Sequence, residues 1–297
     1  MSTARIGQEA VAAKGWWRSH KWLALRRTSQ LAILALFLAG PWFGLWLVKG
    51  NLNFSYTLDF LPLTDPYVLL QGVLAGHAPA SRALIGAAIV VGFYLLVGGR
   101  VYCAWVCPMN LVTDLAAWLR RRLGIKGGAH VSRHARFWIL GMTLALAFAG
   151  GGIAWELVNP VSMLHRGLIF GFGAAWTVVL AVFLVDLFVI NRGWCGHFCP
   201  VGAFYSLLRG LRLLHVSAVR RSACDDCNDC FVVCPEPLVI VAPLKDGDKG
   251  VGPAISSAQC TNCGRCVDVC TKDVFAFGGR HVRTVSTQAG AAQAAPQ

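Results

Sequence analysis

Twelve cysteines are the residues of this 297-residue chain whose spacing most clearly predicts chemistry. Two groups repeat the spacing C-x2-C-x2-C-x3-C, and two repeat C-x3-C-P. The members of the four groups are Cys224, Cys227, Cys230 and Cys234; Cys260, Cys263, Cys266 and Cys270; Cys103 and Cys107; and Cys195 and Cys199. Because thiolates are soft ligands for zinc, copper(I) and iron–sulfur clusters, we treat all four groups as candidate metal sites.

The two C-x2-C-x2-C-x3-C runs predict a pair of [4Fe–4S] clusters, bound as in bacterial ferredoxins. Three thiolates two residues apart can reach three irons of one cube, while the fourth thiolate points to the other cluster. The first cluster is therefore predicted to bind Cys224, Cys227, Cys230 and Cys270. The second is predicted to bind Cys260, Cys263, Cys266 and Cys234.

Disulfides and zinc account for these eight cysteines less well. Disulfides need an oxidising compartment, whereas the charge distribution described below places this segment in the cytoplasm. A zinc ribbon uses two C-x2-C pairs and would leave four thiols without a role. One departure from the usual cluster-binding run is that Thr271, and not proline, follows Cys270.

The two C-x3-C-P motifs predict a third metal centre, although a dithiol and a simple turn remain open. On a helix, residues i and i+4 share a face with Cβ atoms about 5–6 Å apart, which is too wide for a relaxed disulfide. If the two motifs face each other, their four thiolates could hold an iron–sulfur cluster or another thiolate-bound metal. The alternatives are a redox dithiol or docking motif, and a turn in which proline begins a surface helix.

Four long apolar stretches are predicted to position these motifs, near residues 28–48, 83–98, 137–155 and 168–190. A helix that crosses a bilayer takes about 17–25 residues. The chain is 56% hydrophobic and only 14% charged, whereas ordinary soluble domains are about 25% charged. We therefore predict an α-helical polytopic membrane protein with four transmembrane helices.

Lysine and arginine are unevenly distributed around these stretches. The tail to Arg27 carries six, the 99–136 loop seven and the segment after Ile190 eleven, against two and one in the 49–82 and 156–167 loops. The positive-inside rule then places both termini and the cluster-binding segment on the cytoplasmic side of a bacterial inner membrane. The net charge of +13 indicates topology and contact with anionic membrane lipids, so no nucleic-acid partner is predicted.

The membrane half is predicted to consist of two duplicated halves. Two pairs of segments align, namely Asp65–Gln71 with Asn159–His165, and Arg100–Pro108 with Arg192–Pro200. Each half has a helix, an external loop with an Asx-Pro turn, a second helix and a C-x3-C-P motif. An amphipathic helix on the inner leaflet is expected after each proline, at 108–123 and 200–214.

These patterns divide the chain into four parts. They are a basic cytoplasmic tail (1–27), a four-helix membrane domain with both C-x3-C-P motifs and two inner-surface helices (28–220), an α+β ferredoxin domain with two [4Fe–4S] clusters (221–283), and a disordered tail (284–297). Within the ferredoxin domain, LVIVAPL (238–244) is expected to form a strand, and 272–283 to close the sheet. Its acidic surface suits a basic redox partner, or simple solubility.

A lipid-soluble quinone is the predicted carrier within the membrane. The chain has no C-x-x-C followed by histidine for c-type haem, no pair of histidines within a helix interior for b-type haem, and no Gly-rich dinucleotide fingerprint. Quinol oxidation needs a proton acceptor, and Glu156 and His165, near Trp155 and Arg166, are the predicted catalytic residues in the outer loops. The alternative is that Glu156 and Arg166 pair only to fix the loop.

Asp186 is the only formal charge within a predicted span. Charged residues inside membranes are functional by default, because unpaired burial costs at least about 2.5 kcal/mol. Asp186 lies near the cytoplasmic end of its stretch, so we favour a structural ion pair with Arg192 or Arg100 over a proton or quinone role.

Several motifs together are similar to the NapH family of integral-membrane, ferredoxin-type proteins. They are KGWWRSH (14–20), GPWFG (40–44), PLTDP (62–66), both C-x3-C-P motifs, WELVNPVS (155–162) and GWCGHFCPVGA (193–203). The resemblance covers about residues 14–278. It implies a four-helix inner-membrane quinol dehydrogenase component with two cytoplasmic [4Fe–4S] clusters. It also implies electron transfer to periplasmic nitrate reductase, through a periplasmic iron–sulfur protein or a membrane-anchored multihaem cytochrome c.

Three alternative functions are left open by the sequence. One is a metal reductase or an assembly polyferredoxin for a copper–haem oxidase, and another is a flavin-bearing regulator of nitrous-oxide respiration. Both of these are expected to carry an additional folded domain. The third is an iron–sulfur scaffold that recruits partners without turnover, which reduction of its clusters by quinol would exclude.

Overall fold

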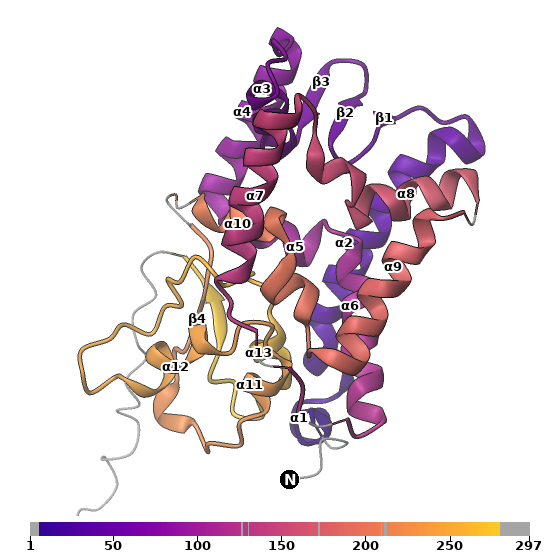
Figure 1. The fold of residues 1–297 in the computed structure, drawn as a ribbon. Coiled ribbons are helices and arrows are strands. Elements are labelled where there is room, and N and C mark those ends of the chain that lie inside the picture. The colour runs from indigo at the N-terminus through magenta and orange to yellow at the C-terminus, as the bar shows by residue number, and fades with distance from the viewer. Residues whose placement is uncertain are drawn as a thin grey trace, which may run out of the picture.

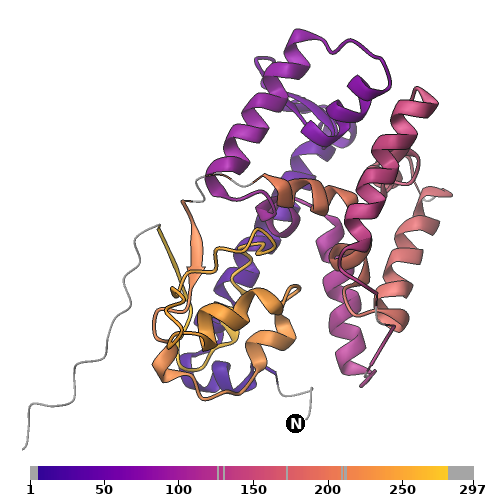
Figure 2. The ribbon, with the colours of Figure 1, turned by 60° about the vertical axis from the view of Figure 1, so that its left-hand side comes forward.

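The computed structural model describes residues 6–125, 127–129, 131–171, 173–208, 210 and 213–279; the tail predicted to be disordered, 284–297, lies outside them. Within the described residues the molecule has two parts. A helical part with a small sheet occupies the top and right of Figure 1, and a cysteine-rich unit that begins at β4 lies below it on the left. Figure 2 shows the N-terminal helices running beside this unit.

The long helix α2 (Trp16–Phe43) connects the two parts, and the short α1 (Gln8–Lys14) precedes it. Its N-terminal half contacts α13 (Arg265–Val269) of the cysteine-rich unit, and the helix also contacts α5 and α8 of the helical part. Its 28 residues span about 42 Å at 1.5 Å per residue, more than the roughly 30 Å hydrocarbon core of a bilayer. By length and composition, α2 could therefore cross a membrane.

Three shorter apolar helices coincide with the other predicted spans. They are α4 (Ser81–Val97), α7 (Ala135–Gly150), and α9 (Ala175–Leu184) with its π-helical continuation η3 (Val185–Val189). None exceeds 17 residues, which is the lower limit for a spanning helix. Among the described residues, α2 is thus the one helix that meets the length criterion. The prediction of four spanning helices is not confirmed by helix length.

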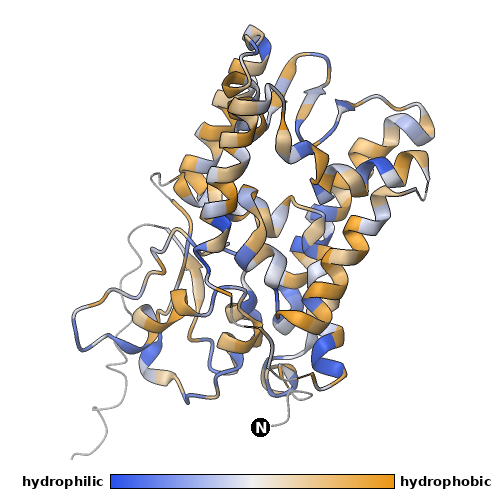
Figure 3. Ribbon diagram, viewed as in Figure 1, coloured by the Kyte–Doolittle hydropathy of each residue, from blue (hydrophilic) through white to orange (hydrophobic). Residues whose placement is uncertain are grey.

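Large apolar side chains are exposed on these helices. Figure 3 shows hydrophobic residues along α4, α7 and α9. On α7, Trp138 and Phe148 are 79% and 73% exposed, and on α4 Phe93 is 53% exposed. Extended apolar surface marks contact with a membrane or another protein. It therefore supports a membrane protein.

The first predicted external loop contains an antiparallel sheet that we did not predict. Its strands follow in chain order as β1 (Val48–Gly50), β2 (Phe54–Thr57) and β3 (Leu61–Thr64), and β3 packs on α4. Strands of three or four residues give too short an alternation to separate from an irregular loop.

The two predicted Asx-Pro turns begin equivalent helices. Asp65 accepts a hydrogen bond from the Tyr67 N–H at 2.8 Å at the start of α3 (Pro66–Leu74). Asn159 accepts one from the Val161 N–H at 3.1 Å at the start of α8 (Pro160–Phe170), which follows the 3-10 turn η2 (Ala154–Leu157). In both cases proline occupies the first helical position, where it loses no hydrogen bond. This part of the internal repeat is therefore present in the structure.

A helix also follows each C-x3-C-P motif. Cys103 of the first motif lies on the short α5 (Val101–Trp105), and Cys107 and Pro108 connect α5 to α6 (Met109–Arg122), close to the predicted 108–123. The second lies on the π-helix η4 (Trp194–Phe198) and precedes α10, which ends earlier than predicted, at Pro200–Leu207. Helix α6 packs against α9 and η3 through small side chains, while Leu115 and Trp118 face outward.

The cysteine-rich unit contains the helices α11 (Asp229–Val233), α12 (Leu238–Lys245) and α13, and the short η5 (Arg221–Ala223). Its two-stranded sheet pairs β4 (His215–Ser217) with β5 (Ala276–Gly278) in antiparallel register. The described part of 272–283 therefore does close a sheet. The partner strand lies just before the expected domain boundary at residue 221.

The prediction of a strand at 238–244 is wrong, because this segment forms α12. Pro237 precedes it with φ −60° and ψ −28°, which already directs the chain into a helix. Ile240 and Leu244, four residues apart, are both buried in the core of the unit. The apolar run has few polar residues, so its period could not separate a helix from a strand.

Candidate iron–sulfur sites

Two small cavities in the cysteine-rich unit are each lined by four cysteines. The distal cradle consists of Cys224, Cys227, Cys230 and Cys270. The proximal cradle consists of Cys234, Cys260, Cys263 and Cys266. Each cradle takes three cysteines from one run and the last cysteine from the other, which is the crossed arrangement that the spacing predicts.

The local backbone explains how each run surrounds a cavity. Asn228 and Gly264 adopt positive φ angles of 65° and 71° immediately before α11 and α13. These left-handed residues turn the chain so that Cys230 and Cys266 fall within the first turn of the two helices. At Gly264 a Cβ atom would lie 2.7 Å from the Cβ of Trp22, so the close approach of α2 also requires glycine there.

The donor set fits iron–sulfur clusters. Among the residues with described positions, no three His, Cys, Asp or Glu side chains are placed to bind one metal ion. Four thiols around a shared space instead suit a cubane, in which each thiolate binds a different iron. We infer that the cradles would hold [4Fe–4S] clusters, which act as one-electron carriers when bound.

Charges around the two cradles differ. Burial, and then the neighbouring thiols, raise the pKa of Cys230 in the distal cradle to about 12. Burial also acts on Cys263, in the proximal cradle, but the guanidinium groups of Arg265 and Arg26 outweigh it and bring the pKa of this thiol below its usual value. Within the proximal cradle this effect is specific to Cys263, because burial raises the pKa of Cys234 and Cys266.

The four C-x3-C-P cysteines, Cys103, Cys107, Cys195 and Cys199, are brought together in the centre of the molecule. Cys103, Cys107 and Cys199 pack against one core that includes the stacked rings of Tyr102 and Tyr205, with centroids 4.9 Å apart. The pKa of Cys195 is raised by burial and then by its neighbours, including the other three thiols. The structure therefore joins the two motifs as the duplication predicts.

Side chains of α2 fix the first motif. The end of α5 leaves carbonyl groups without helical partners. Gln30 donates a hydrogen bond to the Ala104 carbonyl and Ser29 donates one to the Trp105 carbonyl, both at 2.8 Å. Gln30 is completely buried. These contacts hold the segment between Cys103 and Cys107 in place.

Asp186 fixes the second motif. It accepts a hydrogen bond from the Trp194 N–H at 2.9 Å, at the start of the π-helix that carries Cys195. The ion pairs that we expected for it are formed elsewhere, since Arg192 pairs with Asp114 and Arg100 pairs with Glu236. Asp186 is completely buried, and in place of the expected ion pair it stabilises the start of a helix by accepting a backbone hydrogen bond.

The thiol environment differs from that of a reactive dithiol. Burial raises the pKa of Cys199 to about 12, and nearby backbone N–H groups of Gly202 and Val201 only partly offset this. Reactive cysteines have lowered pKa values, so the raised pKa of Cys199 does not match that of a reactive thiol. A Cβ at Gly202 would lie 3.8 Å from the Cys103 sulfur, which shows that glycine keeps open the space beside the thiols.

The proximal cradle contacts the C-x3-C-P cysteines through two direct links. The Trp105 indole N–H donates to the Asn262 carbonyl at 3.0 Å, joining the residue between Cys103 and Cys107 to the residue before Cys263. Arg100 donates to the Cys195 carbonyl at 3.2 Å and to the Glu236 carboxylate at 2.7 Å. The two groups of thiols are thus held in fixed relation.

Two buried carboxylates dock the cysteine-rich unit on the helical part, and sequence analysis missed both. Glu236 is 2% exposed and pairs with Arg100 and Arg136, each at 2.7 Å, and also with Arg133. Asp114 pairs with Arg265 at 2.6 Å, with Arg192 at 3.2 Å and with Arg27. The composition contained a signal for these ion pairs. The chain has 14 acidic residues against 27 Lys and Arg, so an acid near a cysteine motif is expected to pair with a basic side chain.

The predicted quinol residues lie in the helical part, Glu156 on η2 and His165 on α8. The Glu156 carboxylate accepts hydrogen bonds from Asn53 at 2.7 Å and Asn159 at 3.1 Å, whereas its ion pair with the exposed Arg166 is 4.0 Å long. His165 is buried edge-on against Phe37, and its Nε2 has no partner among the described residues. The asparagines, more than Arg166, therefore hold the Glu156 carboxylate.

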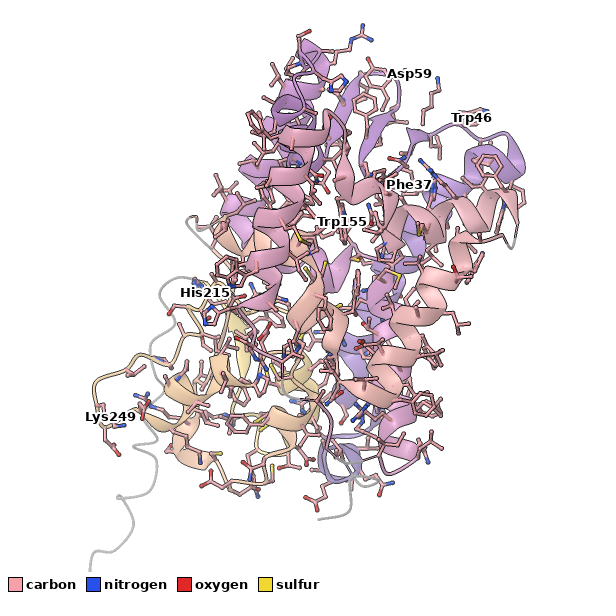
Figure 4. The ribbon with its side chains drawn as sticks, viewed as in Figure 1. Phe37, Trp46, Asp59, Trp155, His215 and Lys249 are labelled. Carbon is pink, nitrogen blue, oxygen red and sulfur yellow. The ribbon has the colours of Figure 1, made fainter. Side chains whose placement is uncertain are left out.

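Trp155 connects this end to the central cysteines. Figure 4 shows Trp155 in the middle of the helical part, near Phe37 of α2. The Trp155 ring stacks on the Trp194 ring, with centroids 6.2 Å apart and planes at 20°. Trp194 directly precedes Cys195, so the stacked pair joins the residue before Glu156 to the residue before a C-x3-C-P cysteine.

Comparisons with known proteins agree with these sites. A "4Fe-4S binding domain" family model matches twice, at residues 80–126 and 172–217, so each match contains one C-x3-C-P motif. A "4Fe-4S dicluster domain" model matches residues 223–274. No solved structure matches the chain.

Curated relatives match over nearly the whole chain. The ferredoxin-type protein NapH of Escherichia coli is 48% identical over 92% of this chain and 95% of its own length. The chain belongs to the family of ferredoxin-type proteins that includes NapH. The methylamine utilization ferredoxin-type protein MauN is equally close, at 53% identity over 90% of this chain and 92% of the relative in Methylorubrum extorquens. The family is therefore one of ferredoxin-type proteins with an electron-transfer role.

Proposed function

We propose that this protein is an inner-membrane quinol dehydrogenase component that passes electrons through three cysteine sites placed in series. One observation carries the proposal. From Glu156, the stacked Trp155 and Trp194 lead to the C-x3-C-P cysteines, and the Trp105–Asn262 hydrogen bond leads on to the proximal cradle. The proximal and distal cradles share one small core.

The proposal places α2, α4, α7 and α9 with η3 across the membrane. Their exposed apolar side chains support this placement, and the shorter helices require tilt or local thinning of the bilayer. The basic tail and the cysteine-rich unit then lie in the cytoplasm, as the distribution of Lys and Arg indicates. Glu156 and His165 lie at the periplasmic end.

Glu156 and His165 are proposed to receive the protons of quinol. A carboxylate or a neutral imidazole can accept a proton from a hydroxyl within hydrogen-bond reach. Burial lowers the pKa of His165, and the charge of Arg166 adds to this effect, so the ring is held in the neutral form that accepts. The asparagines around Glu156 orient its carboxylate without neutralising it.

Quinol oxidation can be tested on the anaerobically purified, cluster-loaded protein in lipid nanodiscs. A reduced quinol analogue should reduce the clusters, as followed by electron paramagnetic resonance, and Glu156→Gln and His165→Ala should each slow this at least tenfold. Lys49→Gln is the control, because this exposed lysine pairs with Asp59; it should have little effect. Unchanged rates in both Glu156→Gln and His165→Ala would place the quinol site elsewhere.

The proposed third centre has its own test. Two cubanes correspond to about eight irons per chain and three to about twelve. Iron and sulfide analysis should give the higher value for the wild type and the lower one for a Cys103→Ser/Cys195→Ser variant. Eight irons in both proteins would leave the C-x3-C-P cysteines without a cluster.

The proposed final acceptor is periplasmic nitrate reductase, reached through a periplasmic iron–sulfur protein or a membrane-anchored multihaem cytochrome c. The hydrocarbon core is about 30 Å thick, so the cytoplasmic clusters cannot pass electrons to this acceptor directly. Quinone, or the C-x3-C-P centre nearer the membrane, is proposed to carry them outward. The NapH relatives support it, but the MauN relatives, one of them 53% identical, equally support supply of electrons to or from methylamine utilization. Complementation of strains that lack NapH or MauN separates the two. We expect restored nitrate respiration; restoration of growth on methylamine alone would assign the second role.

A further inference from the structure

A cavity of about 780 Å³ lies where α1, α2, α6 and α13 meet; it contains none of the quinol residues or cysteines, and it shares Arg265 with the proximal cradle. Sites for small molecules have volumes of about 300–1,000 Å³. The cavity is open to the surface between the cysteine-rich unit and α6. Nothing in the proposed electron-transfer route uses it.

Arginine side chains dominate the charge around the cavity. Six arginines and two aspartates line it, namely Arg26, Arg27, Arg121, Arg122, Arg192 and Arg265, with Asp114 and Asp268. Asp114 is already shared by three of the arginines. Asp268 accepts hydrogen bonds from the N–H groups of Trp22 and Leu23. The lining therefore holds more positive charge than its carboxylates neutralise.

Two of these guanidinium groups are buried with donor capacity to spare. Arg26 is 1% exposed; its Nε donates to the Trp22 carbonyl, and its Nη1 has no partner in the described part of the chain. Arg265 is 7% exposed, and its Nη1 is likewise unpartnered although Nη2 binds Asp114. A buried donor without an acceptor costs about 1–3 kcal/mol, and more when charged. An anionic acceptor in the cavity would remove this cost.

One wall of the cavity is apolar. Leu111, Leu115 and Trp118 of α6 form it, and Leu115 and Trp118 are 54% and 47% exposed, so the wall continues onto the outer surface. Arg122 lies over the Trp118 ring at 5.5 Å. The apolar run of α2 begins directly after Arg27, so the cavity lies at the cytoplasmic edge of the proposed membrane-spanning part. A ligand that fits has an anionic head and an apolar tail.

We propose that this cavity binds an anionic phospholipid of the cytoplasmic leaflet, with its phosphate between Arg26, Arg121 and Arg265 and its acyl chains along Leu115 and Trp118. Arginine forks suit phosphate oxygens, and basic pockets on the cytoplasmic side of membrane proteins bind anionic lipid heads. The proposal rests on the membrane location proposed above, but it does not depend on quinol oxidation.

Arg26 and Arg265 also face the proximal cradle, so part of their charge serves the thiolates there. Arg121 and Arg122 belong to α6 and are the residues to change when the lipid site is tested. Arg82, which is exposed and lies over the ring of Tyr56 on the sheet, provides a matched control.

The test uses the cluster-loaded full chain in a neutral detergent. Phosphatidylglycerol, phosphatidylcholine or inorganic phosphate is added, and bound lipid is measured by native mass spectrometry and by the shift in thermal unfolding. We expect phosphatidylglycerol to bind at least tenfold more tightly than phosphatidylcholine. The Arg121→Gln/Arg122→Gln variant should lose this preference, and Arg82→Gln should keep it.

A second variant, Trp118→Ala, keeps the charges and should weaken binding of the lipid but not of inorganic phosphate. The cluster spectrum checks that each variant is folded. Equal binding of the two lipids, or a preference that survives Arg121→Gln/Arg122→Gln, would overturn the proposal. Competition by inorganic phosphate as strong as that by lipid would instead identify a site for free phosphate.

Discussion

The distal and proximal cradles are built from the same cysteine spacing but lie in opposite electrostatic surroundings. Beside the distal cradle, Asp225 and Asp226 are exposed, and Lys245 pairs with Asp226. Around the proximal cradle, Arg26 and Arg265 lower the pKa of Cys263. Reduction adds a negative charge, which positive neighbours favour and negative neighbours oppose. We therefore expect the proximal cluster to have the higher reduction potential.

The difference shows how position, and not the motif, sets the properties of each site. The distal run faces solvent and contacts the N-terminal segment, where the Gly7 N–H donates a hydrogen bond to the Asp229 carboxylate. The proximal run contacts α2, α5 and α6, which bring the Arg26 guanidinium, the Trp105 indole and the Asp114 carboxylate that accepts from Arg265. A cluster beside the helical part can exchange electrons with it, and a cluster beside exposed acids can meet a soluble partner.

Removing one ligand from each cradle should have the largest effect. Cys227→Ser is expected to remove the distal cluster and Cys263→Ser the proximal one, each lowering iron by about four per chain. Electron paramagnetic resonance should show one of the two signals lost in each variant. Unchanged spectra in both variants would contradict the ligand assignment.

Loss of the buried carboxylate beside the proximal cradle should be the next largest effect. Glu236→Gln leaves buried arginines without their counter-ion, which costs about 3–5 kcal/mol. Asp225→Asn, the matched change at the exposed distal rim, should cost under about 0.5 kcal/mol. Chemical unfolding of the two variants measures the difference, and equal losses would show that Glu236 is not a docking residue.

Charge substitution should change the potentials without removing a cluster. Arg265→Gln is expected to lower the proximal potential on the order of 59 mV, the equivalent of a tenfold change in equilibrium for one electron. Arg265→Lys keeps the charge and should restore most of it. Redox titration followed by electron paramagnetic resonance tests this. If the proximal potential changes with the stability of the variants and not with the charge at position 265, the difference between the two clusters is not electrostatic in origin.

The smallest effect is expected at the distal rim. Asp225→Asn should raise the distal potential by less than Arg265→Gln lowers the proximal one, because solvent and salt screen exposed charges. Repeating the titration at low and high salt should show the distal shift shrinking and the proximal shift persisting. Equal salt sensitivity would mean that both cradles are open to solvent.

Sequence reasoning predicted what depends on short spacing. The crossed arrangement of the eight cysteines follows from loops two and three residues long, and the Asx-Pro turns follow from the geometry of a helix start. Helix α12 was missed because Val239, Ile240 and Val241 suit a strand in isolation. The burial of Ile240 and Leu244 in the core of the unit decided the outcome.

The docking contacts could not be predicted, because they join residues far apart in the chain. Arg100 and Glu236 are 136 positions apart, and Trp105 and Asn262 are 157 apart. Asp186 illustrates the same limit. Its burial near the end of a helix was predicted, but its partner is the backbone of Trp194 and not a guanidinium group. Only the fold determines which of several nearby arginines a carboxylate meets.

The distance along the chain between Glu236 and its arginines also gives the protein an order of assembly. During synthesis, Arg136 leaves the ribosome 100 residues before Glu236, and Arg100 leaves 136 residues before it. Until Glu236 arrives, these guanidinium groups must stay hydrated, since burying them unpaired is costly. The helical part therefore cannot close the face that carries Arg100 and Arg136 until the cysteine-rich unit has folded. A chain that failed to mature would display this open basic face, by which a protease or chaperone could distinguish it from a finished protein.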